Sequence, residues 1–170
     1  KYFFLSRPRR FGESLLLSTI KSIYQGRRDL FRGLWIEHQR DWNKINPVIH
    51  LSFASMSYRE LGLEKAIRVQ LQTTAAEHGF HFANTDSIAR MFAELLEKLA
   101  KQQGKVVILI DEYDRPLIDY LDDIPLAKTN QQVMKTFYSI IKDSDPYIEF
   151  LLITGVSKFS RASLFSDLNN

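Results

Sequence analysis

Two short motifs contain the residues of this sequence whose types and spacing suit phosphate chemistry. Gly12-Glu13-Ser14 lies where an apolar strand pattern gives way to a helical pattern, and Asp111-Glu112 ends a second apolar run. Backbone N–H groups at the start of a helix bind phosphate, whereas neighbouring carboxylates bind Mg²⁺ and activate water. Together the two motifs predict a site that binds and hydrolyses a nucleoside triphosphate.

The first motif resembles a Walker A phosphate-binding loop, G-x-x-x-x-G-K-S/T. Aligned on Gly12, Ser14 takes the position of the residue that ligates Mg²⁺, Arg7 replaces the first glycine and Glu13 replaces the lysine. The match is weak by itself, but its place between a strand and a helix is the one that the chemistry requires. We therefore expect a nucleotide-binding loop made of Arg7, Pro8, Arg9, Arg10, Phe11, Gly12, Glu13, Ser14 and Leu15.

The second motif is an apolar strand followed by two acids, the pattern of a Walker B motif with an added catalytic glutamate. We expect Asp111 to hold the Mg²⁺ shell and Glu112 to orient or deprotonate the attacking water. A third apolar strand ends at Thr154, whose hydroxyl is expected to contact the γ-phosphate or the water. Each of these features also occurs at the ends of ordinary strands. The prediction therefore depends on the order in which they follow one another along the chain.

The elements that must position these residues alternate between strand and helix, which predicts an α/β fold with a mainly parallel sheet and helices on both faces. Strands are expected at Tyr2–Ser6, Pro47–Phe53, Lys105–Asp111 and Ile148–Thr154. Helices are expected from Glu13 to about Gln25, from a capping box at Ser57 and Glu60 to Gly79, from Ile88 to Gly104, and near Gln131–Lys142. The acidic segment Asp114–Thr129 is expected to be a flexible loop.

Length and composition narrow the class of protein. The 170 residues suffice for one domain with a full core, and we expect a single domain over 1–170 within a longer chain. The absence of cysteine excludes disulfides and thiolate chemistry. No apolar run reaches the roughly 18 to 20 residues of a membrane span, and a cytoplasmic location is the default expectation. Arginines at 7, 9 and 10 and at 27, 28 and 32 form two clusters suited to phosphate, of a nucleotide or of a nucleic acid.

Three segments resemble a known family over essentially the whole length of the chain. They are Ser6–Gly12, Leu109–Asp114 and Ile153–Ser160, the last continuing into Leu164–Asn169, and they look like the predicted bacterial AAA-ATPase-like proteins. The resemblance implies a P-loop NTPase-like fold that uses ATP and Mg²⁺. It also implies that a restriction-endonuclease-like nuclease domain often follows toward the C-terminus. Arg7 is normal for this family, but Glu13 in place of the lysine is not.

Glu13 reverses the charge at the central phosphate contact. One unit pair at about 4 Å in an effective dielectric near 20 is worth roughly 4 kcal/mol. Losing that attraction predicts ATP binding weakened about tenfold or more, with hydrolysis weakened further because charge concentrates there in the transition state. The ATPase activity is therefore expected to be weak or absent. Backbone amides and the helix dipole remain whatever the side chain is.

Several alternatives stay open from the sequence. The alternative to an impaired ATPase is a non-hydrolysing pseudo-ATPase scaffold, or a regulatory module for an attached nuclease domain. Nucleic-acid binding through the arginine clusters has weak support, because no stacking aromatics interleave them. A homo-oligomer would allow an arginine finger from another subunit, with Arg161 as an internal candidate. A serine hydrolase is disfavoured because Leu16 stands where a nucleophile elbow needs its second glycine.

Overall fold

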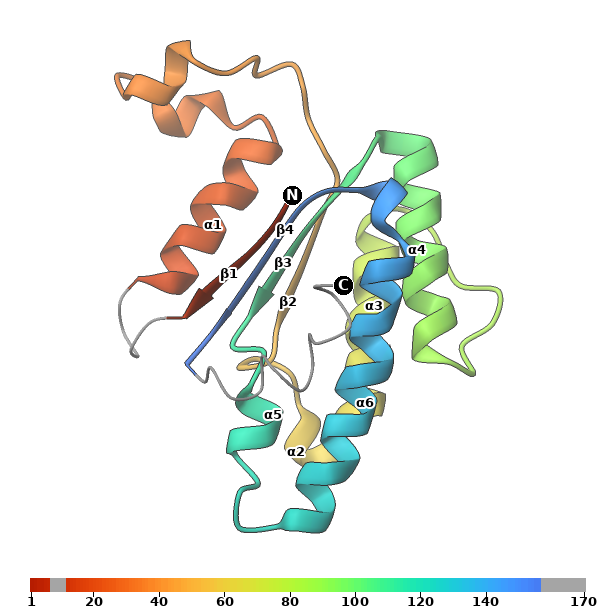
Figure 1. The fold of residues 1–170 in the computed structure, drawn as a ribbon. Helices are drawn as coiled ribbons and strands as arrows, with labels where there is room; N and C mark the ends of the chain where they lie inside the picture. Colours follow the sequence, from red (N-terminus) through yellow and green to blue (C-terminus); the bar gives the residue numbers. More distant parts are fainter. Residues whose placement is uncertain (7–11, 157–170) are drawn as a thin grey trace.

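A parallel sheet of four strands in the order β1-β4-β3-β2 forms the centre of the fold. The computed structural model describes residues 1–6 and 12–156, and it is shown in Figure 1. The strands are β1 (Tyr2–Ser6), β2 (Val48–Ser52), β3 (Val106–Asp111) and β4 (Ile148–Gly155). All four lie within one or two residues of their predicted bounds, because each is an apolar run bounded by polar or glycine residues.

Helices connect the strands and cover both faces of the sheet (Figure 1). The α-helices are α1 (Glu13–Tyr24), α2 (Tyr58–Leu61), α3 (Leu63–Glu77), α4 (Ile88–Gln103), α5 (Arg115–Ile118) and α6 (Ile124–Asp143), and the 3₁₀-helices are η1 (Arg28–Phe31), η2 (Trp35–His38) and η3 (Asp145–Tyr147). None of the helices in the described part of the chain is long and apolar enough to cross a membrane.

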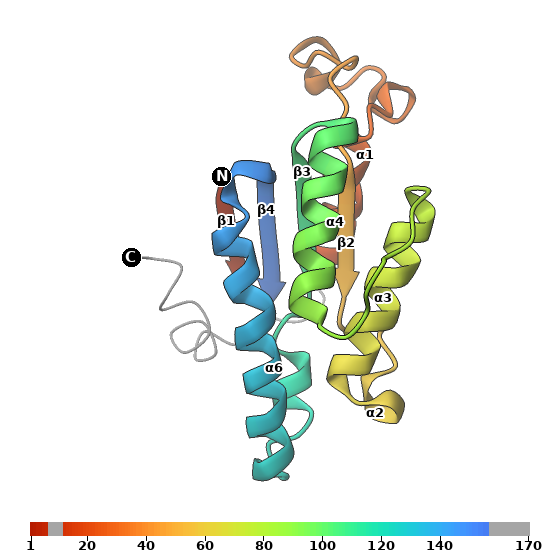
Figure 2. The ribbon, with the colours of Figure 1, turned by 90° about the vertical axis from the view of Figure 1, so that its right-hand side faces the viewer.

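The two faces of the sheet carry cores of different size. On one face α1 inserts Leu17 among Val48, Val107, Leu109 and Leu152. The opposite face packs against α3, α4 and α6 in a much larger apolar cluster (Figure 2). The predicted inward-facing residues of α4 are all buried there: Ile88, Met91, Phe92, Leu95, Leu96 and Leu99. Every residue of the central strand β3 is buried, as a sheet covered on both faces requires. The predicted fold class is confirmed.

Two local predictions are wrong. The capping box at Ser57 does not start one long helix: α2 ends after Leu61, and Gly62 at φ 81° begins α3 in a new direction. The Ser57 side chain makes no capping bond in this structure. A left-handed glycine favours such a break more strongly than the capping box favours continuation.

The expected acidic loop is helical over much of its length, because α5 and the first turns of α6 occupy it. Each of these helices has a proline in its first turn, where the missing N–H costs nothing. The side chain of Asp123 also accepts a hydrogen bond from the N–H of Leu126 at 3.1 Å, capping α6. The acids of this segment therefore start and flank helices and do not mark a flexible loop.

Candidate active site

The carboxyl ends of all four strands lie at one edge of the sheet, and the predicted site residues gather there. Because the sheet is parallel, Ser6 is in register with Gly155, Leu5 with Thr154 and Ser52 with Asp111. In α/β proteins with parallel sheets, this edge is where ligands bind. Five of the predicted loop residues fall outside the described part of the chain: Arg7, Pro8, Arg9, Arg10 and Phe11.

Gly12 turns the chain into α1. It has φ 80° and ψ 21°, a left-handed conformation that favours glycine, and its carbonyl accepts a hydrogen bond from Leu16 N–H at 2.9 Å. Glu13 is then the first residue of the helix, followed by Ser14. The start of α1 lies at the same edge of the sheet as the carboxyl ends of β1 and β3 (Figure 1). Leu15 is largely exposed.

Asp111 forms hydrogen bonds with two other predicted site residues, Ser14 and Thr154. Its Oδ2 accepts a hydrogen bond from Ser14 Oγ at 3.0 Å, and its Oδ1 accepts one from Thr154 Oγ1 at 2.6 Å. Asp111 is 5% exposed and Thr154 is fully buried. Ser14 and Thr154 thus bind the same carboxylate, although they lie 97 and 43 positions from Asp111 in the sequence.

Glu112 leaves β3 with an unusual backbone conformation. Among the described residues it is the only non-glycine residue with a positive φ, 51°. Its N–H donates to Thr154 Oγ1 at 3.3 Å, and the N–H of the next residue, Tyr113, donates to the Thr154 carbonyl at 3.0 Å. Such a conformation persists only where the surroundings hold it, and it occurs often at functional sites. Thr154 therefore contacts both acids of the predicted pair.

Sequence reasoning missed a third acid, Asp114, which is 2% exposed. Its Oδ2 accepts a hydrogen bond from the N–H of Val156 at 3.0 Å, so it fixes the backbone just beyond β4. Gly155 packs closely against Tyr113 and Asp114, and a Cβ at Gly155 would approach Tyr113 Cδ1 to 2.4 Å. In the sequence, Asp114 differs from exposed acids such as Asp122 only as the last residue of the family-like segment Leu109–Asp114.

The side chain of Glu13 is partly buried, and its Oε1 atom is shielded from solvent. An acidic side chain in the first turn of a helix is favoured by the helix dipole. The substitution of the expected lysine is therefore compatible with a well-formed α1. It places negative charge at the end of the helix where a phosphate is expected to bind.

One histidine, His50, lies close enough to charged residues at this edge of the sheet for them to affect its pKa. Burial lowers the pKa of His50 below its ordinary value of 6.5, and the positive charge of Lys21 lowers it further, against an opposing effect of Asp111. Its Nε2 atom is shielded and makes no hydrogen bond within the described residues. His50 is therefore neutral near pH 7.

The donor set around Asp111 fits Mg²⁺ better than a transition metal. Ser14 Oγ and Asp111 Oδ2 are hard oxygen donors 3.0 Å apart. Mg²⁺ is usually held by one or two protein oxygens together with substrate phosphates and water. No group of three or more His, Cys, Asp and Glu residues suited to a metal occurs over residues 1–6 and 12–156.

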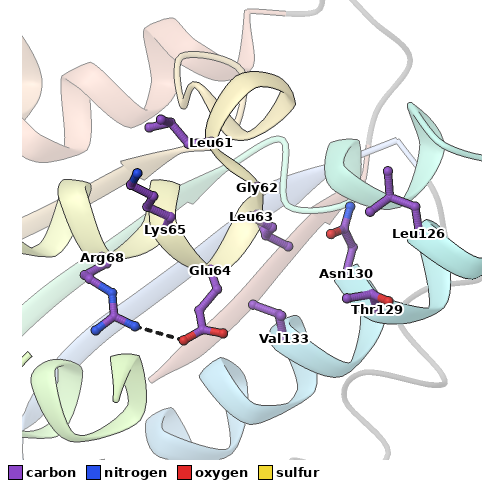
Figure 3. Close-up of a pocket in the computed structure, with 10 residues that line it drawn as sticks. All are labelled: Leu61, Gly62, Leu63, Glu64, Lys65, Arg68, Leu126, Thr129, Asn130 and Val133. Atoms are coloured by element: carbon purple, nitrogen blue, oxygen red, sulfur yellow. Dashed lines mark hydrogen bonds and ion pairs between the residues drawn. The ribbon is translucent and has the colours of Figure 1, made fainter. Parts of the chain in front are cut away.

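A separate hollow of about 510 Å³ lies on the helical face between α2–α3 and α6 (Figure 3). Its walls carry the apolar side chains of Leu61, Leu63, Leu126 and Val133. Glu64 and Arg68 form an ion pair at 2.9 Å on one wall. None of the predicted site residues lines this hollow.

Comparison with known proteins identifies the family of this chain. The family model described as "Predicted AAA-ATPase" matches residues 1–165. The chain is 40% identical over 171 residues to the "Uncharacterized protein in vnfD 5'region" of Azotobacter chroococcum mcd 1. That alignment covers 99% of this chain but 33% of the relative, so the chain spans about a third of the relative's length. No solved structure gives a significant match. The chain belongs to the AAA-ATPase-like family.

Proposed function

We propose that this domain binds ATP together with Mg²⁺ at the carboxyl edge of its sheet and that its ATPase activity is weak or absent. The observation that supports this most directly is the contact of Ser14 and Thr154 with the two oxygens of Asp111. It brings the helix that follows the loop, the central strand and the neighbouring strand to one point. The loop from Arg7 to Leu15 is proposed to surround the phosphates.

Each residue has a distinct proposed role. Ser14 and Asp111 hold Mg²⁺, which neutralises charge on the β- and γ-phosphates when bound. Glu112 orients or deprotonates the attacking water, and Thr154 contacts the γ-phosphate or that water. Thr154 also holds Asp111 and the backbone of Glu112, so the same side chain keeps both acids in place.

Glu13 is proposed to weaken this activity. A carboxylate at the start of α1 competes with the phosphate for the helix N–H groups and repels it. Hydrolysis suffers more than binding because the transition state gathers charge where the lysine is absent.

A second proposal has the same fold without hydrolysis: a pseudo-ATPase scaffold or a regulatory module for an attached nuclease domain. The negative charge of Glu13 favours it. Assembly into a homo-oligomer and contact with nucleic acid are further proposals for the longer protein. Binding to DNA through arginines would weaken steeply with added salt, which separates it from binding of a single nucleotide.

The test is isothermal titration of ATP–Mg²⁺ into the protein and into Glu13→Lys, at one salt concentration. Glu77→Lys is the matched control, since it makes the same change in charge at an exposed position of α3. We expect Glu13→Lys to bind about tenfold more tightly or better and Glu77→Lys to match the parent protein.

The outcomes separate the two proposals. Tighter binding by Glu13→Lys alone, followed by measurable hydrolysis, supports an ATPase site impaired at one residue. Equal and measurable binding by all three proteins shows that loop amides and arginines suffice. If folded Glu13→Lys binds no nucleotide, the ATPase proposal is rejected and the scaffold takes its place.

A further inference from the structure

The side chain of Glu112 is held by a single residue that sequence motifs do not include. Arg115 Nη1 contacts Glu112 Oε2 at 2.6 Å. No described residue donates a hydrogen bond to the other carboxylate oxygen, Oε1. Within residues 1–6 and 12–156, the carboxylate is thus held through one oxygen only.

Arg115 also lies close to a second, partly buried acid, Asp119. Its Nε lies 3.6 Å from Asp119 Oδ2, and Asp119 is 12% exposed at its side chain. The same oxygen accepts a hydrogen bond from Tyr58 OH at 2.6 Å and contacts Arg59 Nη2 at 2.5 Å. Burial raises the pKa of Asp119, but the hydrogen bonds from Tyr58 and Arg59 outweigh it and leave the pKa low. Asp119 therefore stays negatively charged and holds Arg115 by charge.

The short helix that carries Arg115 is attached to two other helices. Asp119, at the end of α5, binds Tyr58 and Arg59 of α2. From the other side, Asn130 of α6 donates its Nδ2 to the carbonyl of Pro116 at 2.8 Å, a buried contact. Figure 3 shows Asn130 on the α6 side of the hollow, opposite α2 and α3. Arg115 thus projects from a helix fixed at both sides.

We propose that Arg115 is a positioning residue for the Glu112 carboxylate and that Asp119 in turn positions Arg115. This inference rests on the proposed function, in which Glu112 acts on the attacking water. Arg115 binds Oε2 and directs Oε1 toward that water. Without it, the carboxylate rotates freely on a backbone whose φ is already left-handed.

The Arg115 and Glu112 side chains are themselves 40% and 38% exposed, so what distinguishes this pair is the second partner of Arg115. Exposed i,i+3 and i,i+4 pairs contribute little, and Arg68–Glu64 on α3 is such a pair. Arg115 differs because its second partner, Asp119, is only 12% exposed at its side chain and is also bound by Tyr58 and Arg59. The contacts of Asp119 with Tyr58 and Arg59 therefore help to hold Arg115 in place beside Glu112.

The functional test uses Glu13→Lys as the background, so that nucleotide binds. We compare Arg115→Gln, Arg115→Lys, Asp119→Asn and the control Arg68→Gln for ATP–Mg²⁺ affinity and for single-turnover hydrolysis. We expect Arg115→Gln to lower the hydrolysis rate about tenfold and Asp119→Asn about threefold, with affinity unchanged. Arg115→Lys should restore part of the rate, and Arg68→Gln should have no effect. An unchanged or faster rate in folded Arg115→Gln would overturn the proposal.

A second measurement needs no nucleotide and so stays valid if the ATPase proposal fails. The Nε–H signal of Arg115 in ¹⁵N NMR is assigned by its loss in Arg115→Lys. We expect Glu112→Gln and Asp119→Asn each to shift it and to speed its exchange with water, while Glu64→Gln leaves it unchanged. A signal insensitive to both acids shows that Arg115 does not hold Glu112. A sensitive signal without nucleotide binding rejects the ATPase role and leaves the positioning contact standing.

Discussion

Thr154 on β4 donates a hydrogen bond to Asp111 on the neighbouring strand β3, with 2.6 Å between Thr154 Oγ1 and Asp111 Oδ1. Both residues are buried, and the same hydroxyl accepts the N–H of Glu112. The Thr154 hydroxyl thus donates a hydrogen bond to a buried carboxylate and accepts one from the backbone N–H of Glu112, whose φ is positive. A buried acid that loses such a donor is costly.

Thr154→Val is predicted to lower the free energy of unfolding by about 1 to 3 kcal/mol, because it keeps the shape but removes the hydroxyl. Thr154→Ser keeps the hydroxyl and should cost less. Urea denaturation of the three proteins measures the difference. A loss for Ser with none for Val would show that packing of the methyl group, and not the hydrogen bond, supports this position.

Gly155→Ala is predicted to destabilise the protein by about 1 to 3 kcal/mol through a direct clash. The added Cβ would lie 2.4 Å from Cδ1 and 2.5 Å from Cε1 of Tyr113, whose ring is fully buried. The check is a double-mutant cycle with Tyr113→Leu, followed by thermal unfolding. The cost of the alanine should fall once the ring is removed, and strictly additive losses would contradict the clash.

His50 is predicted to make stability depend on pH below neutrality. Burial, reinforced by Lys21, lowers its folded pKa below the ordinary value of 6.5. The neutral ring therefore contributes its full stability above pH 6.5, and this contribution is lost as the pH falls through the lower folded pKa. Chemical denaturation at pH 7.5 and pH 5.5 should show a smaller loss for His50→Gln than for the parent. The exposed His81→Gln serves as control and should lose as much as the parent.

Asn130→Ala is predicted to loosen α5 with little effect on the rest of the sheet. The amide of Asn130 donates to the carbonyl of Pro116 at 2.8 Å in a buried setting, and removing it leaves that carbonyl unsatisfied. Hydrogen exchange should quicken at the amides of residues 117–119, while those of β3 stay protected. Uniform quickening in both elements would mean that the substitution destabilises the whole domain instead.

The strands and the long helix α4 could be predicted because burial and pattern agree in them. Their apolar residues recur with a strand or helix period, and every predicted inward residue of α4 is buried. Asp111, Glu112 and Thr154 could be placed at one edge because parallel strands end together. The sequence could not reveal which atoms of these side chains meet.

The segment that follows Glu112 escaped prediction for a physical reason. Its helix α5 has only four residues, too short to show a period, and it is stable because Asp119 and Asn130 attach it to distant helices. Contacts between residues roughly 60 positions apart leave no local pattern. Arg115, the residue that touches Glu112, therefore looks like any arginine beside a proline.

The pairing of β1 with β4 has a consequence for how the molecule is made. Tyr2 lies opposite Leu151, so this ladder joins residues at far separated positions and closes a very long loop. Contacts of such range form slowly, because chain entropy is lost before they stabilise anything. The β3–β4 and β2–β3 ladders join closer segments and have a lower entropic barrier. During synthesis, the residues around Asp111 emerge before Thr154 exists to hold them, so the hydrogen bonds to the Asp111 carboxylate are completed only when β4 docks.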